Sequence, residues 1–137
     1  MATQAKTLEA GPRGTEAAAF AGRMLDVLND GLLSLMLSVG HRTALFDTMA
    51  GLAPATSAEI AEAAGLQERY VREWLGAMVL GGIVEHDPAR GTYLLPPAHA
   101  ACLTRAAGAD NAATLMQYVA RLGGVEDGIV ECFRRGG

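Results

Sequence analysis

His99 and Cys102 are the residues of this sequence whose types and spacing first suggest metal chemistry. Imidazole nitrogen and thiolate sulfur are common zinc ligands, and a His-x-x-Cys spacing can place both on one ion. A structural zinc site needs four ligands, however, and the sequence offers no second pair nearby. We therefore expect no metal site.

Glycine-rich loops that hold nucleotide cofactors are missing from the sequence. It contains no P-loop and no Gly-x-Gly arrangement. The pair Gly81–Gly82 precedes an expected strand, whereas glycines that hold a nucleotide follow a strand and open a helix. The sequence also lacks the nucleophile elbow of hydrolases and the His-Glu-x-x-His motif of zinc proteases. We expect no catalytic residue and no cofactor held by this chain.

Cys102 and Cys132 are the only cysteines, which is too few for the disulfide framework of a small secreted domain. Residues 1–15 have no apolar segment of a secretory signal, and no uninterrupted apolar run is long enough for a transmembrane helix. We therefore expect a cytoplasmic chain with no membrane partner, in which both cysteines are buried thiols.

Residues 16–39 have the pattern of a long helix, whose apolar residues recur at alternating steps of three and four. Further apolar residues lie outside this stripe, so most of the helix circumference is apolar. One small domain covers one side of such a helix, and we expect the rest to pack against a second copy or another domain. The candidate dimer-interface residues are Leu25, Leu28, Leu32, Leu35 and Met36.

The middle of the sequence has the pattern of a winged helix-turn-helix. Thr56 is followed three residues later by Glu59, which is the spacing of a capping box at a helix start. Gly65 suits the left-handed turn between two helices. The expected elements are a short helix within 41–50, helices over 57–64 and 67–80, strands over 83–86 and 92–95, and helices over 98–103, 111–122 and 125–133. The predicted fold class is mainly α: a winged helix-turn-helix with a long N-terminal dimerisation helix, C-terminal helices and a small two-stranded wing.

Arginines on the second helix of this pair and on the wing are candidate DNA contacts. They are Arg69, Arg72 and Arg90. Residues 56–95, however, carry three arginines against six acidic residues, and the whole chain has a formal charge of −4. Such a surface repels phosphate. Arg69 can instead pair with Glu73 one helical turn later. We favour this pairing and expect no nucleic-acid partner.

Trp74 and His41 each have a structural and a functional interpretation. The sole tryptophan, Trp74, is expected to anchor helix packing or an interface and not to stack on a ligand. His41 follows the long helix, where it can contact a ligand or cap the preceding helix. We favour the cap.

Several stretches of the sequence resemble the N-terminal region of bacterial class I methyltransferases. They are Thr56-Ser-Ala-Glu-Ile-Ala-Glu-Ala-Ala64, Gly65-Leu-Gln-Glu-Arg-Tyr-Val-Arg-Glu-Trp-Leu75, Tyr93-Leu-Leu-Pro-Pro-Ala-His99, Gly40-His-Arg-Thr-Ala-Leu-Phe46 and Glu126-Asp-Gly-Ile-Val-Glu-Cys-Phe-Arg-Arg-Gly-Gly137. The resemblance implies an N-terminal winged helix that mediates dimerisation and helps to cover a substrate pocket. It makes His41, Arg42 and Phe46 candidate substrate-lid residues. S-adenosylmethionine is bound in that family by a downstream Rossmann-like domain.

These observations predict a disordered tail over 1–15, a winged-helix dimerisation domain over 16–110 and a helical connector over 111–137 toward a catalytic domain absent from this chain. The leading interpretation is the non-catalytic dimerisation and substrate-lid domain, as a fragment or truncation, of a methyltransferase acting on a small molecule. The alternative is a winged-helix DNA-binding regulator. A third interpretation is a free-standing dimerisation module for a separately encoded catalytic chain.

Overall fold

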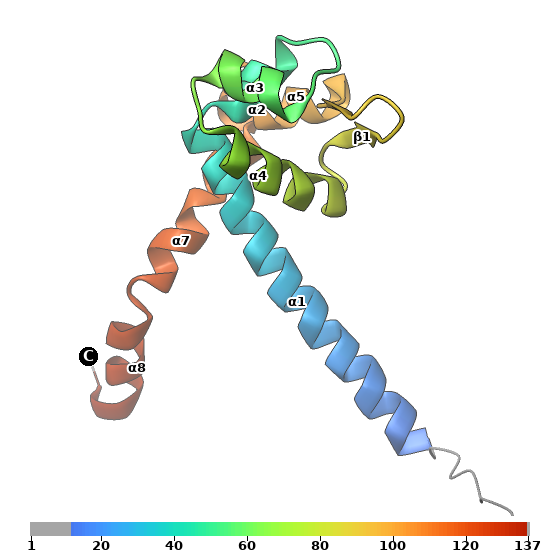
Figure 1. Ribbon diagram of the computed structural model, residues 1–137. Helices are drawn as coiled ribbons and strands as arrows, with labels where there is room; N and C mark the ends of the chain where they lie inside the picture. The colour runs from blue at the N-terminus through green and yellow to red at the C-terminus, as the bar shows by residue number, and fades with distance from the viewer. Residues whose placement is uncertain (1–11, 137) are drawn as a thin grey trace, which may run out of the picture. The chain divides into compact units, whose positions relative to one another are not determined.

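The computed structural model describes residues 12–136 (Figure 1). Contacts divide the chain into two units, Met1–Asp30 and Gly31–Gly137. Helix α1 spans Pro12–Arg42, and its residues 14–30 are all exposed. The tail predicted for 1–15 was wrong for its last residues, because the helix begins at Pro12; proline is favoured at a first helical position, where its missing N–H has no partner to lose. Residues 1–11 lie outside the described part.

The second unit continues from α1 into a winged helix-turn-helix, as predicted. Its elements are α2 (Leu45–Ala50), α3 (Ser57–Ala64), α4 (Glu68–Leu80), β1 (Glu85–Asp87), β2 (Thr92–Leu94), α5 (Pro97–Leu103), the 3-10 helix η1 (Arg105–Asp110), α6 (Ala112–Leu115), α7 (Gln117–Gly123) and α8 (Glu126–Arg135). The two strands pair antiparallel, with Glu85 opposite Leu94. The predicted mainly α fold class is confirmed.

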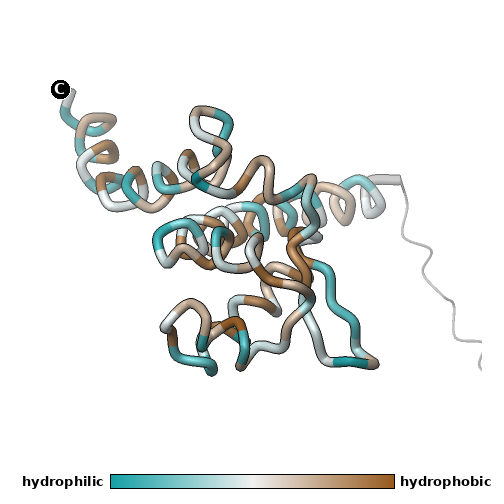
Figure 2. Tube along the Cα trace, turned by 90° about the horizontal axis from the view of Figure 1, so that it is seen from above, coloured by the Kyte–Doolittle hydropathy of each residue, from teal (hydrophilic) through white to brown (hydrophobic). Residues whose placement is uncertain are grey.

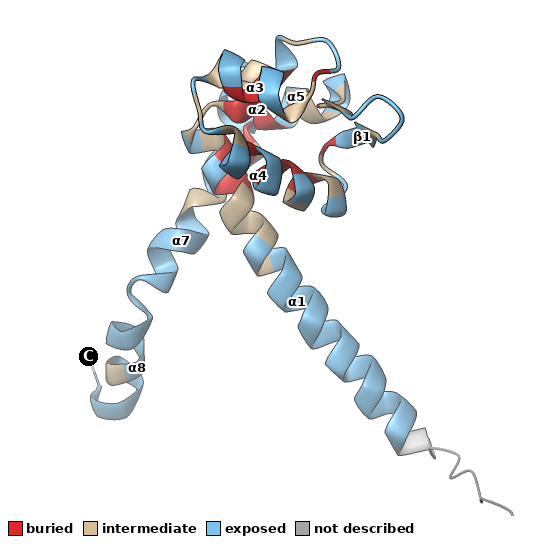
Figure 3. Cartoon of the chain, viewed as in Figure 1, coloured by how far each residue is buried: buried red, intermediate tan, exposed pale blue. Residues whose placement is uncertain are grey.

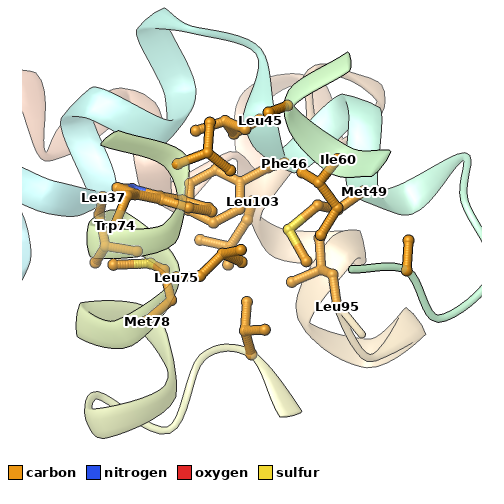
Figure 4. Packing of buried hydrophobic residues seen from close by; sticks show 14 of the residues in the cluster. Leu37, Leu45, Phe46, Met49, Ile60, Trp74, Leu75, Met78, Leu95 and Leu103 are labelled. Carbon is orange, nitrogen blue, oxygen red and sulfur yellow. The ribbon is translucent and has the colours of Figure 1, made fainter. Parts of the chain in front are cut away.

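The core lies among α2, α3, α4 and α5 (Figure 4). Its most fully buried large side chains are Phe46, Ile60, Leu75 and Met78. The indole N–H of Trp74 donates a hydrogen bond of 2.8 Å to the carbonyl of Met36, and the indole ring meets Phe46 edge-on at 5.2 Å between ring centroids. The predicted packing role of Trp74 is confirmed, and this hydrogen bond ties α4 to the last turns of α1.

The sequence had suggested that the long helix ends at Gly40. This was wrong, because α1 continues to Arg42. A Cβ at Gly40 would lie 2.5 Å from Cζ2 of Trp74 and 2.7 Å from Cε2 of Phe46. The glycine therefore serves close packing against two aromatic rings and not helix termination. The chain turns afterwards at Ala44, whose φ of 59° is left-handed.

The wing is shorter than predicted, and its sheet is extended by an isolated bridge between Ala55 and Tyr93. Val84 and Leu95 flank the strands and are buried in the core, which anchors the wing at its base. Tyr93 also stacks on His86, with ring centroids 4.6 Å apart.

The C-terminal region departs from the sequence expectation in its segmentation. The predicted helix over 111–122 is divided at Met116 into α6 and α7, and η1 precedes them. Neither α7 nor α8 has a buried residue (Figure 3). Both mix apolar with polar residues along their length (Figure 2). No helix of the described chain is both long and apolar enough to cross a membrane.

Candidate functional site

The helix-turn-helix is built by local signals that the sequence displays. The Thr56 backbone N–H donates to Oε2 of Glu59 at 2.7 Å, and the Glu59 N–H donates back to the Thr56 hydroxyl at 3.3 Å, which confirms the capping box at the start of α3. Gly65 ends α3 with a left-handed φ of 67°. The Ser57 hydroxyl then donates to Oε1 of Glu68 at 2.7 Å and links α3 to the start of α4.

Replacing Thr56 by alanine is expected to destabilise the domain by about 0.5–2 kcal/mol, because the backbone N–H of Glu59 loses its acceptor. The N–H of Thr56, and then its hydroxyl, lower the pKa of Glu59 below its ordinary 4.5 by binding the ionised carboxylate. That stabilisation is present above the ordinary pKa and is lost as the pH falls through the lowered one. Thr56→Ala removes only the hydroxyl's part of this stabilisation, so its urea midpoint should lie further below that of the parent at pH 7 than at a pH below the lowered pKa, and Thr56→Ser should keep most of the stability. Equal midpoints for Thr56→Ala and the parent at pH 7 would contradict the capping role.

The three arginines proposed as DNA contacts are all exposed, and carboxylates neutralise two of them. Arg72 pairs with Glu68 at 3.5 Å, and Arg90 of the wing pairs with Asp87 at 3.8 Å. The predicted pairing of Arg69 with Glu73 was wrong: within the described residues the ion pair on this helix joins Arg72 to Glu68. The Glu68 carboxylate accepts a hydrogen bond from the Ser57 hydroxyl, and the same oxygen atom lies 3.5 Å from the guanidinium of Arg72.

The structure separates the three substrate-lid candidates. Phe46 is 0% exposed and belongs to the core of the described structure, and its role as a substrate-lid residue stays a prediction. Arg42 is exposed in the last turn of α1, where a cation interacts favourably with the helix dipole. His41 is half-buried; its Nε2 lies 3.5 Å from the Thr114 hydroxyl, and its buried Nδ1 has no hydrogen-bond partner in the described structure.

Arg105 organises this corner, and the sequence analysis missed it. Its guanidinium pairs with the carboxylate of Asp47, and its backbone N–H donates to the same carboxylate at 2.8 Å. A second guanidinium nitrogen donates to the His41 carbonyl at 2.7 Å. The partners are 58 and 64 residues away along the chain, so no local spacing could have revealed them. Arg105 thereby joins the end of α1 and the start of α2 to η1.

The candidate dimer-interface residues of α1 divide into two sets. Leu25, Leu28 and Leu32 are exposed, as a surface for a partner requires. Leu35 is half-buried, and Met36 packs against the core. The further apolar residues Leu33 and Leu37 also contact or join the core, so these side chains are covered within the chain and the expectation that they need a partner was wrong.

An open hollow of about 200 Å³ lies beside the last turns of α1. Its walls are mainly apolar and include Val39, Leu45, Leu66, Tyr70, Val71 and Trp74. Tyr70 is 70% exposed and Val39 is also exposed, so the hollow opens to solvent. A space of this size is smaller than the roughly 300–1,000 Å³ pockets that take small molecules.

The predicted buried thiols were wrong, because Cys102 and Cys132 are both exposed. Leu103 is the buried residue of α5, which carries Cys102, and α8, which carries Cys132, has no buried residue. His99 does not face a metal site: its Nδ1 lies 2.8 Å from the carbonyl of Ile83, at the base of the wing. In the described part of the chain, no group of three or more metal-ligating side chains comes together.

Comparison with known proteins gives one family. Residues 31–105 match the model of the Rv2258c-like winged HTH domain. The match covers the last turns of α1, the helix-turn-helix, the wing and α5. A search of curated proteins finds no match to the chain.

Proposed function

The chain belongs to the family of Rv2258c-like winged HTH domains, and from that premise we propose that its winged helix serves association and not DNA readout. In this proposal it is the N-terminal dimerisation and substrate-lid domain of an S-adenosylmethionine-dependent methyltransferase that acts on a small molecule. The observation that carries it is the exposed apolar stripe of α1, which contains Leu25, Leu28 and Leu32. Contiguous apolar surface of this kind marks interaction sites on water-soluble domains.

The charges of the helix-turn-helix support the same proposal. A DNA-binding winged helix inserts the second helix of its pair into the major groove and clamps phosphates with several cations. Here the arginines of α4 and the wing compete with six carboxylates between residues 56 and 95. Arg72 and Arg90 are already paired with two of them. A DNA backbone approaching this face meets net negative charge.

The link to a methyltransferase rests on the sequence resemblance over residues 40–46, 56–75, 93–99 and 126–137. Isothermal calorimetry is expected to show no S-adenosylmethionine binding by this chain, because the sequence offers no glycine-rich loop between a strand and a helix. A glycine-containing control peptide sets the background heat. Binding of micromolar affinity with defined stoichiometry would contradict this prediction. The coding sequence after residue 137 tests the parentage: an in-frame Asp-x-Gly-x-Gly after a strand pattern supports it.

DNA binding is the second candidate function, because α4 exposes Arg69 and Tyr70 beside each other on a helix-turn-helix. We expect that the chain does not retard sheared genomic DNA in a mobility-shift assay at physiological salt, because residues 56–95 carry a formal charge of −3. A complex that weakens steeply with salt would contradict the association proposal. Its loss in the Arg69→Ala variant, but not in an Arg134→Ala control on α8, would assign the contact to α4.

A further inference from the structure

The hollow beside the last turns of α1 lies wholly within the second unit of the chain. Three of its lining side chains, Leu45, Val71 and Trp74, are buried in the core. Two others, Val39 and Tyr70, are exposed. The hollow therefore has a floor that belongs to the core and a mouth that opens to solvent.

The indole of Trp74 is a fixed wall of this hollow. Its N–H donates to the carbonyl of Met36 at 2.8 Å, and its ring meets Phe46 edge-on. These two contacts hold the indole in one orientation, so the wall exists before any ligand binds. Tyr70 lies one turn earlier on α4 and supplies a second aromatic side chain. Preformed hollows lined by apolar and aromatic side chains are typical of ligand sites.

The volume of the hollow limits the size of its occupant. About 200 Å³ is too little for the drug-sized molecules that fill pockets of roughly 300–1,000 Å³. It is enough for a single aromatic ring, because an apolar cavity of about 150 Å³ binds benzene. Aromatic rings attract one another beyond the effect of the area that they bury. Trp74 and Tyr70 therefore favour an aromatic ring over a saturated one.

The polar groups of the hollow specify the charge and the hydrogen bonding of the ligand. None of the described residues that line it carries a charge, so an ionised ligand would lose its hydration without gaining a partner. The Thr43 hydroxyl donates its one proton to the carbonyl of Val39 at 2.7 Å. Toward a ligand this hydroxyl is therefore an acceptor, and the amide of Gln67 offers a second acceptor oxygen. A neutral ligand with one O–H or N–H donor matches these groups.

We propose that this hollow binds a free, uncharged molecule built on a single aromatic ring that carries one hydrogen-bond donor. Phenol is the simplest example. The ring lies against Trp74 and Tyr70, and the donor reaches Thr43 or Gln67. This ligand site goes beyond the association proposed above and does not depend on it.

Phenol is the probe, and nuclear magnetic resonance of the full 137-residue chain is the measurement. Trp74 is the sole tryptophan, so a single indole N–H resonance reports on the wall of the hollow. We expect phenol to shift this resonance saturably with a Kd on the order of 1 mM, which is within reach of so small a ligand. Anisole, which has the ring but no donor, should bind about twofold to tenfold more weakly. Benzoate should give no saturable shift, because its charge finds no partner.

Two variants test whether phenol binds in this hollow. Val39→Phe adds a ring at the mouth and should weaken phenol binding by about tenfold or more, because the two rings compete for the same space. Val119→Phe is its matched control, since Val119 lies on α7, outside the hollow, and is 41% exposed against 40% for Val39. Tyr70→Ala removes one aromatic wall and should weaken binding about twofold to tenfold. Tyr118→Ala, on the exposed side chain of another tyrosine, should keep the parent affinity.

The outcomes separate this proposal from the association of the chain. Parent affinity for phenol in both Val39→Phe and Tyr70→Ala, or equal shifts by phenol and benzoate, would overturn it. If Val39→Phe is unfolded by circular dichroism, Tyr70→Ala decides alone. A Trp74 resonance that shifts when the protein is diluted, but not when phenol is added, would assign the hollow to a second copy and overturn the ligand site. A monomeric chain that binds phenol would support the ligand site and contradict the association.

Discussion

Replacement of Phe46 by alanine is expected to destabilise the fold by about 3–5 kcal/mol, the usual effect of removing a buried aromatic side chain. The side chain is 0% exposed, and its ring packs against Trp74 and over Gly40. Its loss would leave a cavity where α1, α2 and α4 meet. Because a domain of this size is stabilised by only about 5–15 kcal/mol, the urea midpoint should fall by a large fraction. Equilibrium unfolding followed by circular dichroism measures it.

Phe133→Ala is the matched control for this prediction. Phe133 lies on α8 and is 88% exposed, so the same truncation should change stability by no more than about 0.5 kcal/mol. If Phe46 covered a substrate and contributed little to packing, both variants would unfold at nearly the urea concentration of the parent. That outcome would contradict the placement of Phe46 in the core.

The double change Leu28→Asp and Leu32→Asp is expected to convert a dimer into a monomer. Burial of a leucine side chain stabilises an interface by about 1.5–3 kcal/mol, and a carboxylate in the same place must be solvated or protonated. Both leucines are exposed within one copy, so the charges should leave the fold of a single chain intact. Sedimentation velocity measures the oligomeric state, and circular dichroism checks that helicity is retained.

Leu80→Asp serves as the control for that change. Leu80 is 92% exposed at the end of α4 and lies outside the proposed interface. This variant should remain a dimer, which would show that an added surface charge does not by itself dissociate the chain. A Leu28→Asp/Leu32→Asp variant that remains dimeric would place the interface elsewhere.

The elements that the sequence predicted best are those built from neighbouring residues. The capping box of Thr56 and Glu59 and the left-handed turn at Gly65 depend on residues at most a few positions apart, so the pattern alone identifies them. The spacing of apolar residues likewise predicted α4, which needs only one buried face. Local physical chemistry therefore placed the helix-turn-helix.

The errors fall where distant segments decide the outcome. A glycine such as Gly40 is typical of a helix end. In the structure it lies inside α1, where it leaves room for the rings of Trp74 and Phe46. Leu33 and Met36 are apolar, as are the exposed leucines of the same helix, and only the placement of the neighbouring elements covers them. Arg105 is bound to partners more than fifty residues away. No spacing rule within one helix contains this information.

Sedimentation equilibrium of the unaltered 137-residue chain tests the central claim, that the winged-helix domain self-associates through α1. We expect a dimer at concentrations on the order of tens of micromolar, because the exposed Phe20, Leu25, Leu28 and Leu32 become buried when two copies pair. A mass that rises from monomer to dimer with concentration would support the claim. A well-folded monomer throughout that range would contradict it.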